Sequence, residues 1–122
     1  MEQLKVKTEQ LKKELNRLKQ MYEQNNPPED FKDKQFFLWM KADSTPVYDM
    51  LADWETTALN VVQQQDINLH PQQVVSTREN MELLLMHSYY KDARQKRYME
   101  LYQSIEYIFD QLLRSLKTGR TP

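Results

Sequence analysis

Cysteine is absent from the sequence, which excludes a disulfide framework, a zinc–thiolate site and a thiol nucleophile. Glycine occurs once, at Gly119. Tight hairpin turns and phosphate-binding loops depend on backbone conformations that glycine adopts most easily, so the sequence argues against a β-rich fold and a P-loop. No stretch approaches the roughly 18 consecutive apolar residues of a membrane-spanning helix. These absences indicate an all-α protein that does not cross a membrane.

The N-terminal residues carry charges every two or three positions and lack the apolar core of a secretory signal. Together with the lack of cysteine, this favours a cytoplasmic protein. The formal net charge of −1 gives no reason to expect a nucleic acid or an anionic membrane as the main partner.

The two histidines, His70 and His87, do not occur in a metal-binding pattern. Neither has a glutamate three residues before it, as di-iron bundles require, and they are not four residues apart on one helix. Ser88 follows His87, but neighbouring residues on a helix point about 100° apart, which disfavours a nucleophile–base pair. We therefore expect no metal, no cofactor, no catalytic residues and no enzymatic activity.

Apolar residues recur at alternating steps of three and four along four segments, which is the spacing of one helical stripe. These segments predict helices over residues 2–24, 46–65, 71–91 and 95–117. Their matched lengths and two short connections are typical of a bundle. The sequence therefore predicts a single all-α domain over residues 1–122, folded as a four-helix bundle with up-down-up-down topology.

The second helix is expected to begin at residues 44–46, because a Ser-Thr pair followed by proline is a common helix start. Residues 25–44 then form a connection, opened by Pro27 and Pro28. Large apolar residues crowd into this connection, and we expect them to pack against the bundle in a short helical turn. They are Phe31, Phe36, Phe37, Leu38, Trp39 and Met40.

The stripes of the last three predicted helices define the centre of the core, and six large side chains on them are expected to be buried. They are Trp54, Met81, Leu84, Leu85, Ile105 and Phe109. The first helix has a narrower leucine stripe. We expect this stripe to dock within the same chain, as in a monomer; a homodimer formed through the first helix is the alternative.

Charge is distributed unevenly along the chain. Residues 1–24 contain six basic and four acidic side chains, whereas residues 29–66 contain eight acids and only three lysines. This difference predicts an electrostatic attraction between the first and second helices; an external basic partner that docks on the acidic region is the alternative.

Tyrosines and basic residues gather around the connection between the third and fourth predicted helices. Residues 91–97 carry four positive charges and one aspartate. A solvated connection next to tyrosines that close the core is the simplest interpretation. The alternatives are a ligand pocket lined by tyrosines and a surface on which nucleic-acid bases stack. The candidate partner surface here consists of Tyr90, Lys91, Arg94, Lys96 and Arg97.

From the third predicted helix onward, the sequence HPQQVVSTRENMELLLMHSYYKDARQKRY resembles the central segment of the YppE-like family. These are small bundle proteins of Gram-positive bacteria with no assigned activity. The Phe36-Phe37 pair and Trp54 within an acidic helix resemble the same family, and the resemblance covers about residues 31–117. It implies a four-helix bundle and a cytoplasmic bacterial protein, and it carries over no site residues.

The sequence does not specify a molecular function. Our leading hypothesis is a non-enzymatic bundle that acts through contacts with an unknown protein partner, because aromatic and charged surfaces occur without any catalytic pattern. A small-ligand binder or enzyme with a tyrosine-lined pocket between helices is the main alternative. Weak nucleic-acid binding through residues 91–97 is the third hypothesis, and it is disfavoured because four cations can contact only a few phosphates.

Overall fold

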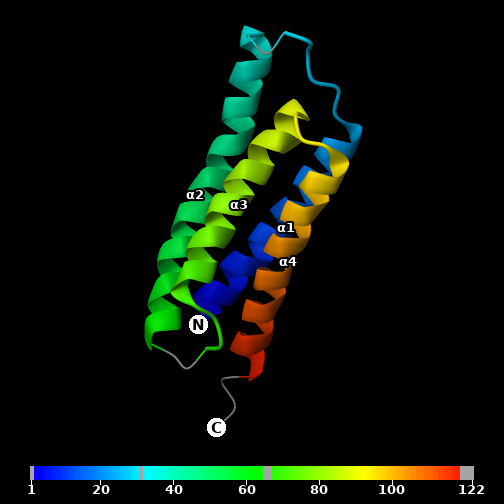
Figure 1. Ribbon diagram of the computed structural model, residues 1–122. Coiled ribbons are helices and arrows are strands. Elements are labelled where there is room, and N and C mark those ends of the chain that lie inside the picture. The colour runs from blue at the N-terminus through cyan, green and yellow to red at the C-terminus, as the bar shows by residue number, and fades with distance from the viewer. Residues whose placement is uncertain (1, 31, 65–66, 119–122) are drawn as a thin grey trace.

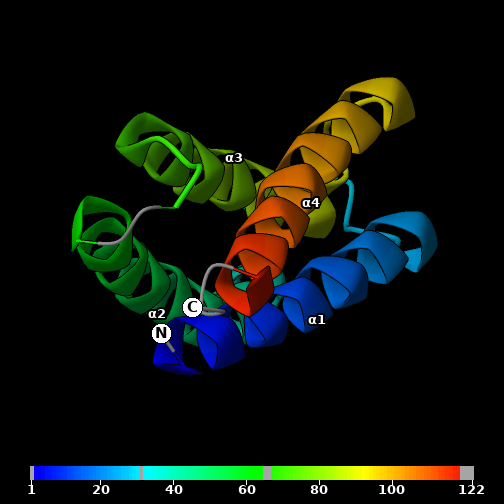
Figure 2. The same cartoon turned by 90° about the horizontal axis from the view of Figure 1, so that it is seen from below.

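The computed structural model describes residues 2–30, 32–64 and 67–118, and these residues form four α-helices (Figure 1). They are α1 (Glu2–Gln24), α2 (Lys34–Gln64), α3 (Pro71–Tyr90) and α4 (Gln95–Thr118). The chain runs alternately up and down, and in an end-on view the helices surround a common core (Figure 2). The predicted all-α, up-down-up-down four-helix bundle is therefore confirmed.

The core lies between all four helices and contains the six side chains expected there. Each of the six is 0% exposed. Trp54 of α2 donates its indole Nε1–H to the hydroxyl oxygen of Thr8 in α1, at 2.9 Å. Its ring also meets that of Phe109 in α4 edge to face, with centroids 5.4 Å apart. One side chain of α2 thus contacts two other helices across the core.

The leucine stripe of α1 is covered within the same chain. Leu4, Leu11, Leu15 and Leu18 are at most 1% exposed, and α1 contacts each of the other three helices. Two ion pairs join α1 to α2, as the uneven charge distribution predicts. Lys7 pairs with Asp53 at 3.2 Å, and Arg17 pairs with Asp43 at 3.0 Å.

The start of α2 differs from the prediction. The helix begins at Lys34 rather than near Pro46, so residues 34–44 are its first turns and not a connection with a separate helical turn. Met40 and Ser44 are buried and continue the stripe of the following turns. The apolar spacing that indicates a helix therefore starts well before the proline. The other three helices agree with the predicted ranges to within one residue.

Pro46 does not mark the start of α2, because its surroundings allow a proline inside the helix. Pro46 cannot donate the backbone bond that the carbonyl of Ala42 would otherwise accept. Both residues are exposed, so water can satisfy that carbonyl. The Thr45 hydroxyl donates back to the carbonyl of Lys41 at 2.6 Å, as a threonine within a helix does, and does not cap a new helix.

Candidate protein-binding surface

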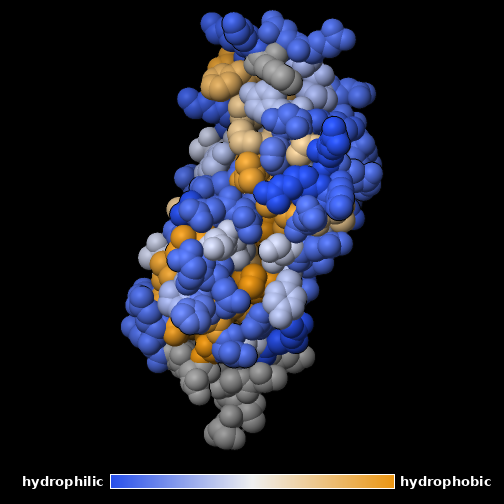
Figure 3. All heavy atoms as spheres, in the orientation of Figure 1, coloured by the Kyte–Doolittle hydropathy of each residue, from blue (hydrophilic) through white to orange (hydrophobic). Residues whose placement is uncertain are grey.

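The first turns of α2 carry three consecutive apolar side chains that the bundle leaves exposed. Phe37 is 46% exposed, Leu38 is 55% exposed and Trp39 is 46% exposed. With Phe36 and with Tyr90 at the end of α3, they form what we call the aromatic end. Figure 1 shows that this end of α2 projects beyond the end of α3, and Figure 3 shows apolar side chains near it among hydrophilic ones. Residues 37–39 lie off the core stripe of Met40 and Ser44, which accounts for their exposure.

Asp33 fixes where α2 starts and hence where these side chains point. Its Oδ1 accepts a hydrogen bond from the backbone N–H of Phe36 at 2.8 Å, which is a helix N-cap. Its carbonyl oxygen accepts another from the N–H of Phe37 at 3.0 Å. Because successive helical residues point about 100° apart, residues 37–39 cannot all face the core.

Two of the rings are held by edge contacts with tyrosines of α3. The Phe36 ring lies 5.4 Å from that of Tyr90, and the Trp39 ring lies 5.4 Å from that of Tyr89, both edge to face. Phe36 and Trp39 also meet each other, with ring centroids 5.6 Å apart. Such contacts orient the rings without covering them, so the aromatic end is a preorganised surface.

This arrangement corrects the prediction that the apolar residues of this segment pack against the bundle. The prediction holds for Met40, which is 6% exposed, and in part for the half-buried Phe36. It is wrong for residues 37–39. Phe31 lies outside the described residues.

Two lysines accompany the apolar side chains of the aromatic end. Leu38 lies four residues after Lys34 and three residues before Lys41, so the three share one exposed face of α2. Neither lysine forms an ion pair within the described ranges. The sequence analysis missed this face, although the spacing of four and then three residues, outside the core stripe, could have revealed it.

The nearby acids, by contrast, are engaged inside the chain. Asp33 caps α2, and Asp30 accepts a hydrogen bond from the backbone N–H of Lys32 at 2.9 Å. Asp43 accepts hydrogen bonds from Arg17 and from the hydroxyl of Tyr89. The aromatic end therefore offers cations whose counter-charges are not supplied by its own acids.

Residues 91–97, which we call the basic elbow, lie at the same end of the bundle (Figure 1). Lys91 ends α3 in a left-handed conformation, with φ of 53°, and donates its N–H to the carbonyl of His87 at 2.8 Å. A non-glycine residue held in this conformation carries some strain. The remaining three cations of the elbow are exposed and form no ion pair within the described residues: Arg94, Lys96 and Arg97.

A polar network underlies the aromatic end and joins three helices. Arg17 of α1 bridges Glu14 and Asp43, at 3.0 Å to each carboxylate. The hydroxyl of Tyr89 donates to the same Asp43. Burial raises the pKa of Tyr89 above its ordinary value, and the hydrogen bond with Asp43 raises it further. The network holds the ends of α1, α2 and α3 in register.

Three other tyrosines, Tyr22, Tyr98 and Tyr102, are buried in the core, whereas Tyr107 is 60% exposed. Tyr98 is 0% exposed, its hydroxyl lies 2.6 Å from that of Ser88, and its ring stacks on Tyr22 at 3.8 Å. Burial raises the pKa of Tyr98 above its ordinary value. Tyr102 is also buried and donates to the side-chain oxygen of Asn16.

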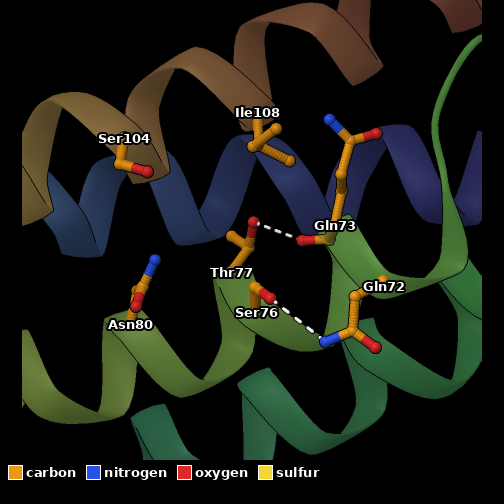
Figure 4. Close-up of a pocket in the computed structure, with 7 residues that line it drawn as sticks. All are labelled: Gln72, Gln73, Ser76, Thr77, Asn80, Ser104 and Ile108. Carbon is orange, nitrogen blue, oxygen red and sulfur yellow. Dashed lines mark hydrogen bonds between the residues drawn. The ribbon is translucent and has the colours of Figure 1, made fainter.

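Two surface hollows bear on the idea of a ligand pocket. One of about 230 Å³ lies between α3 and α4, where uncharged side chains of α3 face Ser104 and Ile108 of α4 (Figure 4). Gln72 and Ser76 bond to each other there at 3.3 Å, and no lining residue could act as a general acid or base. Another of about 210 Å³ lies beside Tyr22. Of these two hollows, the second alone has a tyrosine in its lining, together with Glu23, Lys91 and Gln95.

Within the described ranges, no group of three or more His, Cys, Asp or Glu side chains is placed so that it could hold a metal ion. Among the same residues, no helix combines the length and the apolar character needed to cross a membrane.

A family model for a bacterial domain of unknown function, DUF1798, matches residues 8–116. The chain belongs to this family. The DUF1798 match covers most of α1, which the resemblance noted in the sequence left out, together with the other three helices.

The DUF1798 chain is also similar in structure to protein yppE from Bacillus subtilis, known from an X-ray crystal structure. The TM-score is 0.78 at 19% sequence identity, over 95% of this chain and 94% of that chain. This likeness confirms the fold and the YppE-like resemblance. No curated protein matches the DUF1798 chain in sequence.

Proposed function

We propose that this DUF1798 chain is a non-enzymatic cytoplasmic bundle that binds another protein through the aromatic end and the adjoining basic elbow. The observation that carries the proposal is the run of three consecutive apolar side chains at residues 37–39, each about half exposed. Single exposed apolar residues are ordinary, but a contiguous, preorganised group of them is typical of an interaction site. Aromatic anchors are also enriched where proteins bind tightly.

Several features support a monomer that uses this end. The leucine stripe of α1 is covered by the other helices, so it is not free to pair with a second copy. Trp39 and Phe36 are held by tyrosines of α3, which reduces the side-chain entropy lost on binding.

The proposal is tested by placing a photo-crosslinking amino acid at Leu38 in the bacterium that makes the protein. The matched control is Leu83 on α3, an isolated apolar residue that is 42% exposed. We expect a discrete crosslinked product from position 38 and none from position 83. The product should disappear when Phe37 is replaced by serine and should form again from purified components. Equal crosslinking at both positions, or none at position 38, would contradict the proposal.

A further inference from the structure

The exposed face of α2 that carries Leu38 combines apolar and cationic groups. Lys34 and Lys41 lie on either side of Leu38 on this face, and Phe37 lies next to it. All four side chains are exposed. We infer that the partner of the aromatic end is an acidic protein segment carrying large apolar side chains, which binds on this face. The inference rests on the proposed function and names the chemistry of the partner.

Charge complementarity identifies this occupant. The acids nearest to the face are used as a helix cap, in a turn, or in the network around Arg17. Lys34 and Lys41 have no carboxylate partner within the part of the chain that the structure describes. An apolar residue with a cation on each side favours a segment that offers the reverse pattern, an apolar anchor flanked by glutamate or aspartate.

A lipid surface is a poorer match for the same residues. Glu29, Asp30 and Asp33 lie directly before α2, and the whole chain has a net charge of −1. These acids would repel an anionic membrane brought against the start of the helix. A short acidic segment that lies along the face of Lys34, Leu38 and Lys41 passes only Asp33 of these three acids, and the carboxylate of Asp33 is engaged in the helix cap. A protein segment is therefore the better occupant.

The inference is tested with purified full-length protein and three labelled synthetic peptides, using fluorescence anisotropy. One peptide carries glutamates and leucines, the second lysines in place of the glutamates, and the third serines in place of the leucines. We expect binding of the glutamate–leucine peptide alone. The double variant Lys34→Glu/Lys41→Glu should weaken that binding on the order of tenfold, because two favourable ion pairs become repulsive.

A matched control is Arg94→Glu/Arg97→Glu, which changes the net charge of the protein by the same amount at the basic elbow. We expect it to weaken binding less than Lys34→Glu/Lys41→Glu does. Equal losses in the two double variants would overturn the assignment to the α2 face, since net charge alone would then explain them. Leu38→Ser should abolish binding with unchanged thermal unfolding, and binding that survives this change would also overturn it.

Further outcomes separate this inference from the proposed function. If the lysine–leucine peptide binds as well as the glutamate–leucine peptide, or if none of the three binds, the acidic partner is excluded. Crosslinking at Leu38 in cells would still stand in that case. If the protein binds vesicles of phosphatidylcholine with phosphatidylglycerol more tightly than the acidic peptide, a lipid surface replaces the acidic segment. Loss of crosslinking at Leu38 would instead remove the proposed function itself.

Discussion

The two halves of α2 carry similar apolar residues and have opposite environments. Around Trp54, the helix is flanked by α1 and α3 and faces α4 across the core, so the side chain is fully buried. Around Trp39, the ring meets that of Tyr89 in α3 edge to face, but the indole is about half exposed. The chemistry of the two side chains is identical. What differs is their position on α2: Trp54 lies on the stripe of buried residues that includes Met40 and Ser44, and Trp39 lies beside that stripe.

The largest expected effect comes from removing α1, whose leucine stripe is covered by the other helices. A variant chain beginning at Asn26 lacks α1, whose four buried leucines each contribute roughly 1.5–3 kcal/mol. Their sum is comparable to the net stability of a domain of this size, roughly 5–15 kcal/mol. We expect this variant to aggregate or to lose cooperative unfolding, as measured by thermal unfolding with light scattering.

The full-length protein is the control for that truncation and should unfold cooperatively as a monomer. A truncated chain that remains a well-folded monomer, obtained from a full-length protein that is a dimer, would show instead that α1 is a dimerisation arm.

Replacing each of the two tryptophans by alanine, in separate variants, tests this comparison directly. Trp54→Ala should destabilise the protein by about 3–5 kcal/mol, because it leaves a cavity in the core and removes the partner of the Thr8 hydroxyl. Trp39→Ala should cost less than about 1 kcal/mol, because much of the ring is already in water. Urea unfolding of both variants provides the measurement. Similar losses from the two changes would mean that the aromatic end is covered in solution.

The core half of α2 could be predicted from the sequence because its signal is periodic. The steps of three and four residues around Trp54 specify one face over several turns, and a bundle buries that face. The six predicted core side chains were identifiable for the same reason. Nothing beyond the neighbouring residues along the chain was needed.

The start of α2 was predicted wrongly, because two patterns in the sequence indicate different starting points for the helix. Ser44-Thr45-Pro46 has the composition of a helix start, while Phe36, Met40 and Ser44 already follow the core spacing. Extending the stripe backwards through the proline would have placed the start near Asp33. The exposure of residues 37–39 was missed for the same reason, because these residues lie off the stripe of Met40 and Ser44 once the helix is extended back through Pro46.

Alkaline pH should lower the stability of the folded protein, because it ionises a buried tyrosine. Tyr98 is fully buried, and burial raises its pKa above the ordinary 10.0. The folded state therefore favours the protonated phenol more than the unfolded state does. This contribution is fully present below pH 10, and it is lost as the pH rises from 10.0 through the raised pKa. Stability to urea should fall over that range.

Tyr98→Phe removes the ionising group and should make the loss of stability above pH 10 shallower than in the unmodified protein. At neutral pH the same variant should be destabilised, because the hydroxyl of Ser88 keeps its bond to the carbonyl of Leu84 but loses its second partner at 2.6 Å. Parallel pH profiles for the two proteins would show that Tyr98 does not contribute to alkaline unfolding.

The most local expected effect is at the exposed half of α2, where Asp33 caps the helix. Asp33→Ala removes the acceptor for the backbone N–H of Phe36, which should cost about 1 kcal/mol. Because the first turns of α2 have few covering neighbours, the change should appear mainly as local fraying and not as a lower overall stability. Hydrogen exchange should speed up at the amides of residues 36–40 and stay unchanged around Trp54. Asp33→Asn keeps a side-chain acceptor and should retain most of the protection. If Asp33→Ala accelerated exchange equally along the whole helix, the two halves of α2 would be one cooperative unit, and the aromatic end would be as firmly held as the core.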